Sequence, residues 1–217
     1  LSLRNTFRRK RRLALTLMTL ALGSAIFMAV FTVRTSLLQT LDDALKYWQY
    51  DVGVVFNRPY RVDDIEQQAL AVPGVVAAET WGYHSVRRER PDGTESDGLV
   101  LIAPHADTKL LQPDVWRGRW LLPDDENAVV INTDFLQQEP DVRIGQQITL
   151  QMDGRSTEWT VVGMIRGVLS GATVYANYPY FTRVARNVDR AGSVQVLTDA
   201  DTAAAQQQIA RALEQQF

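Results

Sequence analysis

The chain of 217 residues contains no cysteine, so its fold uses neither disulfide bonds nor thiolate metal ligands. Its two histidines, His84 and His105, lie in different predicted elements, whereas a zinc site needs more ligands at closer spacing. The sequence G-x-x-x-x-G-K-[ST] is also missing, which excludes ATP binding through a P-loop. The acidic pairs at 42–43, 63–64 and 124–125 are sequence neighbours whose carboxylates point apart. We therefore expect no catalytic residue, no metal and no cofactor in this chain, and we do not classify it as an enzyme.

Charged side chains are missing over 21 consecutive positions, residues 13–33. A helix of this length rises about 30 Å, the thickness of the hydrocarbon core of a bilayer. We therefore predict a transmembrane helix at 13–34. A secretory signal peptide is one alternative, but its apolar core is shorter, about 7–15 residues, and the residues after Ala25 stay bulky here. A buried helix of a soluble protein is the other alternative, but such helices rarely lack charge on every face.

Basic residues precede this run, and an acid-rich chain follows it. Residues 1–12 hold six basic side chains and no acidic one: Arg4, Arg8, Arg9, Lys10, Arg11 and Arg12. The remaining 17 basic and 25 acidic residues carry a net charge of −8. A basic flank is normally retained in the cytoplasm, so we predict that residues 1–12 form a cytoplasmic or interfacial anchor. The membrane is then the cytoplasmic (inner) membrane, and the chain is extracytoplasmic after about residue 34. Nucleic-acid binding is disfavoured, since the basic cluster would lie against anionic lipid headgroups.

Leucines continue at helical spacing beyond the predicted span. Residues 35–47 hold a leucine stripe on one helical face: Leu37, Leu38, Leu41 and Leu45. We predict a stalk helix within 35–50, which would transmit movement between the membrane and an outer domain. The stripe is also suited to packing against a partner stalk.

Beyond residue 50 the pattern predicts an α+β domain with two lobes. A β-α-β-β order comes first, with a turn at 57–60 and a capping-box-like Asp63 and Glu66 at the start of the helix. The four predicted elements are a strand at 51–57, a helix at 63–71 and strands at 75–88 and 98–103. We assign 51–106 and 168–217 to an α/β lobe, whose later elements are a strand at 172–175, a helix at 180–189, a strand at 193–198 and a helix at 201–217.

A small all-β lobe is predicted between these parts, at 107–167. Short strands with frequent turn signals dominate this region. Its strands are expected at 128–132, 147–152 and 157–164, and Asp153-Gly154 predicts a hairpin between the last two. Four aromatic residues are candidates for contact with a substrate or between the lobes, although packing in the core or between the lobes is the more common role of such residues: Trp81, Tyr83, Trp116 and Trp120.

Three stretches resemble the FtsX-like permease family, whose outer part is the MacB-like periplasmic core domain. They are LSLRNTFRRKRRLALTLMTL at the N-terminus, AVPGVVAAE after the first outer helix, and the insert with Gly118-Arg119-Trp120, AVVIN, DVRIGQQITLQ and TVVGMIRG. The resemblance implies an ABC transporter permease, with a porter-type lobe and an inserted small β lobe.

The resemblance also implies how such a permease works and with what it assembles. ATP is hydrolysed by a separate subunit or domain, and the movement reaches the outer domain by mechanotransmission, for export or extraction of a substrate. The expected partners are an ABC ATPase, a second permease copy or homologous half, the lipid bilayer and an unidentified substrate, without nucleic acid.

Two other classes fit the same pattern. A membrane-anchored sensor would also combine a basic anchor, one span and an outer α/β domain, and the sequence beyond Phe217 would separate it from a permease. An anchored extracytoplasmic enzyme is the weaker alternative, because catalytic groups are missing. The chain starts at Leu1 rather than Met, so we expect an excerpt of a longer protein with further spans.

Overall fold

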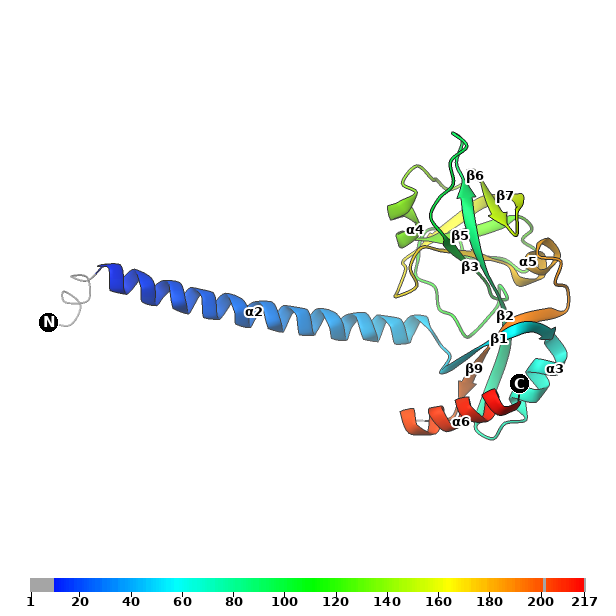
Figure 1. The fold of residues 1–217 in the computed structure, drawn as a ribbon, viewed down its shortest axis with the longest axis horizontal. Helices are drawn as coiled ribbons and strands as arrows, with labels where there is room; N and C mark the ends of the chain where they lie inside the picture. Colours follow the sequence, from blue (N-terminus) through cyan, green and yellow to red (C-terminus); the bar gives the residue numbers. More distant parts are fainter. Residues whose placement is uncertain (1–9, 201, 217) are drawn as a thin grey trace. The chain divides into compact units, whose positions relative to one another are not determined.

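The computed structural model describes residues 10–200 and 202–216, and the chain divides after Ala44 into two compact units (Figure 1). The first unit contains most of α2 (Lys10–Tyr47), a helix of 38 residues. The second unit, Leu45–Phe217, is called the outer domain below. The predicted span and stalk are therefore parts of one continuous helix. That helix ends inside the outer domain, at Tyr47.

One half of the outer domain is a three-stranded sheet backed by two helices, and we call it the α/β half. β9 (Arg190–Thr198) lies between β1 (Val52–Arg61) and the first part of β2 (Val75–Glu89), and both pairings are antiparallel. α3 (Val62–Leu70) and α6 (Ala203–Gln216) pack against this sheet (Figure 1). Their core-facing residues recur at helical spacing, and they meet alternate residues of β1 and β9. The shared core is apolar: Val52, Ile65, Ala69, Val194, Val196, Ile209 and Leu213.

The other half is a closed ring of six strands, and we call it the barrel half. The second part of β2 pairs with β3, and pairing continues through β8, β5, β7 and β6 back to β2. β4 joins β7 outside this ring. The bounds are β3 (Leu99–Ala103), β4 (Val115–Gly118), β5 (Ala128–Asn132), α4 (Thr133–Gln138), β6 (Gln147–Met152), β7 (Arg155–Ile165), β8 (Thr173–Ala176) and α5 (Tyr178–Val184).

Two apolar clusters cover the two faces of the ring strands. One cluster includes Leu99, Leu101, Val129, Ile131, Leu150, Trp159, Val161 and Val174. The other cluster contains the intervening residues of β3, β5 and β8, namely Ile102, Val130 and Tyr175. They pack against Leu110 and Leu111, in the segment after β3, and against Tyr47 at the end of α2. Burial on both faces explains why β3, β5 and β8 have continuous apolar sequences rather than alternating ones.

β2 belongs to both halves, and Gly82 lies where it passes from one to the other. Residues up to Trp81 pair with β9, whereas Gly82 pairs with Ala103 of β3. A Cβ atom at Gly82 would lie 2.3 Å from Cε1 of Phe181 and 2.9 Å from Cβ of Ala103. Glycine is therefore required here by the close approach of α5 to the strand.

The predicted α+β class and most predicted elements are confirmed, including the Asp153-Gly154 hairpin. Both turn residues have positive φ, 50° and 72°, as a two-residue type I′ turn requires. The predicted turn at 57–60 is wrong, because β1 continues to Arg61 and pairs with β9 again at Tyr60 after a register irregularity. The capping box is also wrong: Arg61 is the N-cap of α3 without a side-chain bond, and Glu66 accepts hydrogen bonds from Thr80 instead.

Other differences concern the barrel half. α4 and β4 were not predicted, and the helix predicted at 180–189 is α5, which ends at Val184. β3 and β8 lie in the ring, although boundaries at 107 and 167 would place them beside β1 and β9. Their apolar sequences carry no periodicity that indicates which strands are their neighbours. The exact lobe boundaries stay a prediction, since the whole outer domain is one compact unit.

Candidate functional site

The first candidate site is the apolar surface of α2. Its large apolar side chains between Leu15 and Val33 are 53–67% exposed, a surface suited to lipid rather than water. By length and composition α2 qualifies as a membrane-crossing helix. Of the predicted anchor residues, Arg4, Arg8 and Arg9 lie outside the described part, Lys10 begins α2, and Arg11 and Arg12 are exposed.

The predicted stalk stripe lies on the C-terminal part of the same helix. Leu37, Leu38, Leu41 and Leu45 are 58%, 51%, 46% and 74% exposed. The part of α2 that carries them contains neither glycine nor proline. The helix therefore presents an unbroken apolar stripe, and its role in coupling stays a prediction.

The end of α2 is held in the barrel half by its aromatic residues. The Tyr47 hydroxyl donates to the hydroxyl of Tyr175 on β8 at 2.8 Å, and both side chains are buried. Trp48 forms a single β-bridge with Leu111, and its Nε1 donates to the carbonyl of Val168 at 3.4 Å. Backbone bonds from Gln49 to Leu110 and from Gln112 to Tyr47 extend the bridge on both sides. Burial raises the pKa of Tyr175 to about 12, so its hydroxyl stays protonated at physiological pH.

Asp51 fixes the next part of the chain to the α/β half. Its backbone N–H donates to the carbonyl of Val196. Its Oδ2 accepts from the backbone N–H and the hydroxyl of Thr198, each at 2.8 Å. Its Oδ1 accepts from Nε2 of Gln206 on α6 at 3.0 Å. One carboxylate thus joins the end of β9 to α6 directly before β1 begins.

The four predicted contact aromatics occupy two different environments. Trp81 is 2% exposed and Trp120 is half-buried, and both belong to the aromatic cluster around Tyr47 and Tyr175. Nε1 of Trp120 donates to the carbonyl of Ala106, and its ring lies 5.6 Å from that of Tyr175. Tyr83 and Trp116 are 56% and 45% exposed. The structure therefore brings Trp81 and Trp120 together in the core, and the role of all four in substrate or lobe contact stays a prediction.

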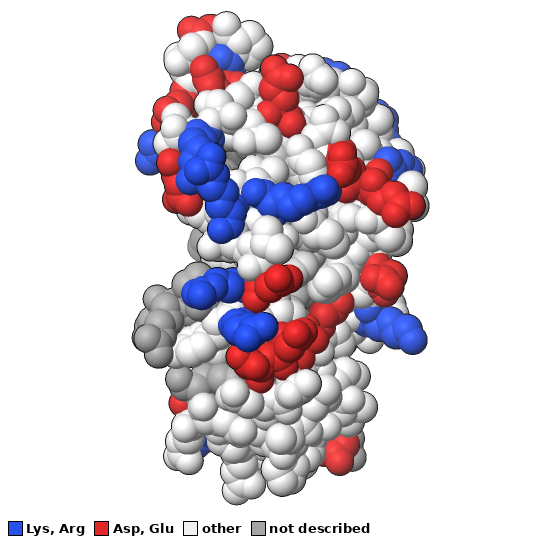
Figure 2. Space-filling model, turned by 90° about the vertical axis from the view of Figure 1, so that its right-hand side faces the viewer, with Lys and Arg blue, Asp and Glu red and all other residues white. Residues whose placement is uncertain are grey.

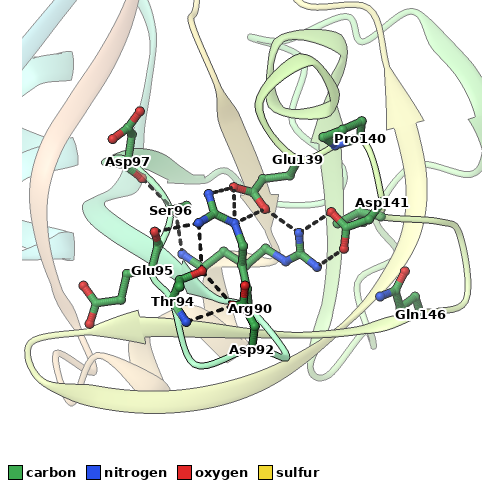
Figure 3. Close-up of polar contacts among 12 residues, drawn as sticks. Arg90, Asp92, Thr94, Glu95, Ser96, Asp97, Glu139, Pro140, Asp141 and Gln146 are labelled. Carbon is green, nitrogen blue, oxygen red and sulfur yellow. Dashed lines mark hydrogen bonds and ion pairs between the residues drawn. The ribbon is translucent and has the colours of Figure 1, made fainter.

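A buried ion-pair network joins β2 to the end of α4 (Figure 3). Arg88 and Glu139 are each 1% exposed and form an ion pair. Arg88 also binds both oxygens of Asp141, at 2.7 and 2.5 Å, and Arg90 binds Glu139 from the other side at 2.6 Å. These hydrogen bonds raise the pKa of Arg88, with Asp141 as the largest cause, and Arg88 in turn lowers the pKa of Asp141. The network pairs a buried basic side chain with a buried acidic one, and leaving either of them without the other in the interior would be costly.

Sequence reasoning missed this network, although one signal was available. Val86 is buried and faces the core, and Arg88 follows it two positions later on the same strand. Residues two apart on a strand share a face, so Arg88 occupies a core-facing position. A charged residue at such a position needs a partner, but no sequence pattern indicated that the partner is Glu139.

A groove of about 680 Å³ lies between the two halves, alongside α3 and α5. Its lining includes Asp63, His105, Tyr178, Arg183 and Asp189, and none of the four predicted contact aromatics lines it. Figure 2 shows one face of the molecule on which basic and acidic side chains are interspersed, without one sign dominating. The groove has the size of a small-molecule site, but its lining does not define a particular ligand.

Comparisons with known proteins agree with this arrangement. A family model described as the MacB-like periplasmic core domain matches residues 13–215. The extracellular domain of the noncanonical ABC-type transporter YknZ from Gram-positive bacteria has a similar structure, with a TM-score of 0.52 and 15% identity, over 75% of this chain and 91% of that one. The periplasmic region of MacB from Actinobacillus actinomycetemcomitans gives a TM-score of 0.51 and 12% identity, over 79% of this chain and 86% of that one. A comparison with curated proteins finds no match.

The fold and the apolar N-terminal helix thus define the class as a membrane-anchored, extracytoplasmic part of an ABC-type transporter permease. Within this class the chain belongs to the family of MacB-like periplasmic core domains, because the family model covers nearly its whole length.

Proposed function

We propose that this chain couples ATP hydrolysis in the cytoplasm to movement of the outer domain, for export or extraction of a substrate. The observation that carries the proposal is the continuity of α2, which runs from the predicted anchor to Tyr47 in the core of the outer domain without a break. ATP hydrolysis belongs to a separate ABC ATPase subunit or domain. The chain lies in the cytoplasmic membrane with its N-terminus inside.

The exposed stalk stripe supports a second part of the proposal, a dimer. Leu37, Leu38 and Leu41 are apolar and about half exposed on a helix beyond the predicted span. An apolar stripe at this spacing is typical of helices that pack against one another. The partner stalk would come from a second permease copy or a homologous half.

The test of the coupling role is a co-purification with an activity assay. The full-length gene is expressed in membranes, the protein is captured through this chain, and the bound proteins are identified by mass spectrometry. We expect a stoichiometric ABC ATPase and measurable ATP hydrolysis. If no ATPase is captured and none is fused in the same polypeptide, the proposal is wrong and a membrane-anchored sensor becomes the better explanation.

A break in α2 tests the coupling more directly. Insertion of Gly-Gly after Leu41 interrupts the helix, since glycine costs about 1 kcal/mol per residue relative to alanine. We expect ATP binding to remain while outer-domain movement no longer follows nucleotide binding. The matched control is the same insertion after Gly93, in an exposed turn of the outer domain. Nucleotide-dependent movement that survives insertion after Leu41 would contradict the coupling role.

A further inference from the structure

The last residue of α2 and the four residues that lead from it to β1 form the segment Tyr47–Asp51, which we call the junction segment. Its first residues contact the barrel half, through Tyr175, Leu110 and Leu111. Its last residue contacts the α/β half, through β9 and α6. The two sets of hydrogen bonds share no side chain. The junction segment is therefore hydrogen-bonded to each half through a different residue, and the rings of Trp48 and Tyr50 also pack against Trp81 of β2.

We propose that the junction segment is a branch point, which delivers movement of α2 to the barrel half through Tyr47 and Tyr175 and to the α/β half through Asp51. The inference rests on the proposed coupling function and assigns the residues that carry it into each half. Tyr47, Tyr175 and Asp51 are positioning residues in this scheme, because each acts through the residues to which it is hydrogen-bonded.

The barrel attachment is suited to passing on small displacements. The bond between the two tyrosine hydroxyls is 2.8 Å long and buried, so neither hydroxyl can exchange its partner for water without opening the core. Tyr175 lies on β8, which pairs with β3 on one side and β5 on the other. Trp120 packs against the Tyr175 ring and reinforces its position. A shift of Tyr47 therefore reaches three strands of the ring through a single side chain.

The α/β attachment uses charge rather than burial. The Asp51 carboxylate accepts three hydrogen bonds, two from Thr198 and one from Gln206. Hydrogen bonds to an ionised acceptor are stronger and more directional than neutral ones. Thr198 is the last residue of β9, and Gln206 lies in the first turns of α6. A shift of Asp51 therefore moves the sheet and one of its covering helices together.

The experiment uses the full-length protein with the ATPase that co-purifies with it. Amide hydrogen exchange is measured at β8 and β9 with and without a non-hydrolysable ATP analogue. The variants are Tyr175→Phe for the barrel attachment and Asp51→Asn for the α/β attachment. The matched controls are Tyr180→Phe, at a half-buried tyrosine of α5, and Asp64→Asn, at an exposed aspartate of α3.

In the unmodified protein we expect bound nucleotide to change the amide exchange rate at both strands by about fivefold. A change of this size corresponds to the net free energy of about one hydrogen bond. Tyr175→Phe is expected to abolish the nucleotide-dependent change at β8 and to keep it at β9. Asp51→Asn is expected to do the reverse, and both controls to leave the two responses intact. Tyr47→Phe removes the same bond from its other end, so it should reproduce Tyr175→Phe even if that variant folds poorly.

The outcomes separate the inference from the function on which it rests. No nucleotide response in the unmodified complex would overturn the coupling function itself. The branch point would be overturned if neither variant altered the nucleotide response of the unmodified protein. It would also be overturned if either variant abolished the response at both strands alike. In both cases the coupling function would still stand. If the substituted residue had a purely structural role, its variant would alter hydrogen exchange in the absence of nucleotide. It would not remove the nucleotide response selectively at one of the two strands.

Discussion

The two halves of the outer domain differ in the interactions that stabilise each of them internally. Among the described residues, the ion pairs all join side chains between His84 and Arg183, in the barrel half. The described core of the α/β half is apolar, and its buried polar groups are neutral side chains such as Thr80 and Ser193. Both halves close around β2, yet among the side chains that the structure describes the buried charged ones, Arg88 and Glu139, lie in the barrel half.

This difference indicates where each half is sensitive. A buried ion pair adds little net stability, because desolvation offsets most of the attraction, but removing one partner leaves the other charge unpaired. An apolar core responds instead to lost volume and is indifferent to pH. Substitutions that remove a buried charge should therefore destabilise the barrel half. Substitutions that remove buried apolar volume should destabilise the α/β half as well as the barrel half.

The largest effect is expected from Glu139→Ala. The substitution leaves the buried Arg88 without its interior partner, and we expect a loss of about 3–5 kcal/mol in unfolding free energy. Urea titration of the purified chain in detergent measures it. The control Glu126→Ala breaks an exposed pair with Arg183 and should cost less than about 1 kcal/mol. Equal effects of the two substitutions would remove the distinction between buried and exposed charge.

The second prediction concerns the apolar half. Leu213 on α6 is fully buried, so Leu213→Ala should lower the unfolding free energy by about 3 kcal/mol through lost contacts and a cavity. The same urea titration at low and high salt should give the same difference. Leu70→Ala, at a leucine that is 51% exposed, is the control and should have little effect. A clear salt dependence for Leu213→Ala would argue against an apolar origin of stability.

A smaller effect is expected where the halves meet. Gly82→Ala would bring a methyl group against the Phe181 ring, and relaxation around it should leave a cost of about 2 kcal/mol. Thermal unfolding followed by circular dichroism measures the shift. Gly192→Ala is the matched control, because a Cβ atom there meets no other atom within 4 Å. An unchanged midpoint for Gly82→Ala would show that α5 can move away from β2.

The smallest effect, and the sharpest test of the comparison, is a pH dependence in the barrel half. The hydrogen bond from Arg88 lowers the pKa of Asp141 in the folded state. The ionised Asp141 therefore stabilises the folded state at a pH above the pKa of an unfolded aspartate, about 3.9. This stabilisation is lost as the pH falls through the lower pKa that Asp141 has in the folded state. Because Asp141 is half-exposed, we expect Asp141→Asn to cost only about 1 kcal/mol at pH 7. The difference from the unmodified protein should shrink when urea titrations are repeated below pH 4, and a constant difference would contradict the assignment.

Features that depend on neighbouring residues could be predicted from the sequence. The charge-free run at 13–33 and the Asp153-Gly154 turn are local, so α2 and the β6–β7 hairpin were found correctly. The ring could not be found, because β3 and β8 are buried on both faces and their sequences do not indicate which strands they join. The junction segment was also missed: Tyr47 and Tyr175 are 128 positions apart, and each alone reads as an ordinary core tyrosine.

β2 is a single strand of 15 residues that pairs first with β9 and then with β3 and β6. Neither half can lose its sheet without withdrawing a partner strand from the other. Unfolding of the outer domain should therefore be one cooperative transition, and probes placed in either half should report the same midpoint. A substitution in one half then lowers the melting temperature of both, although the forces that hold them differ.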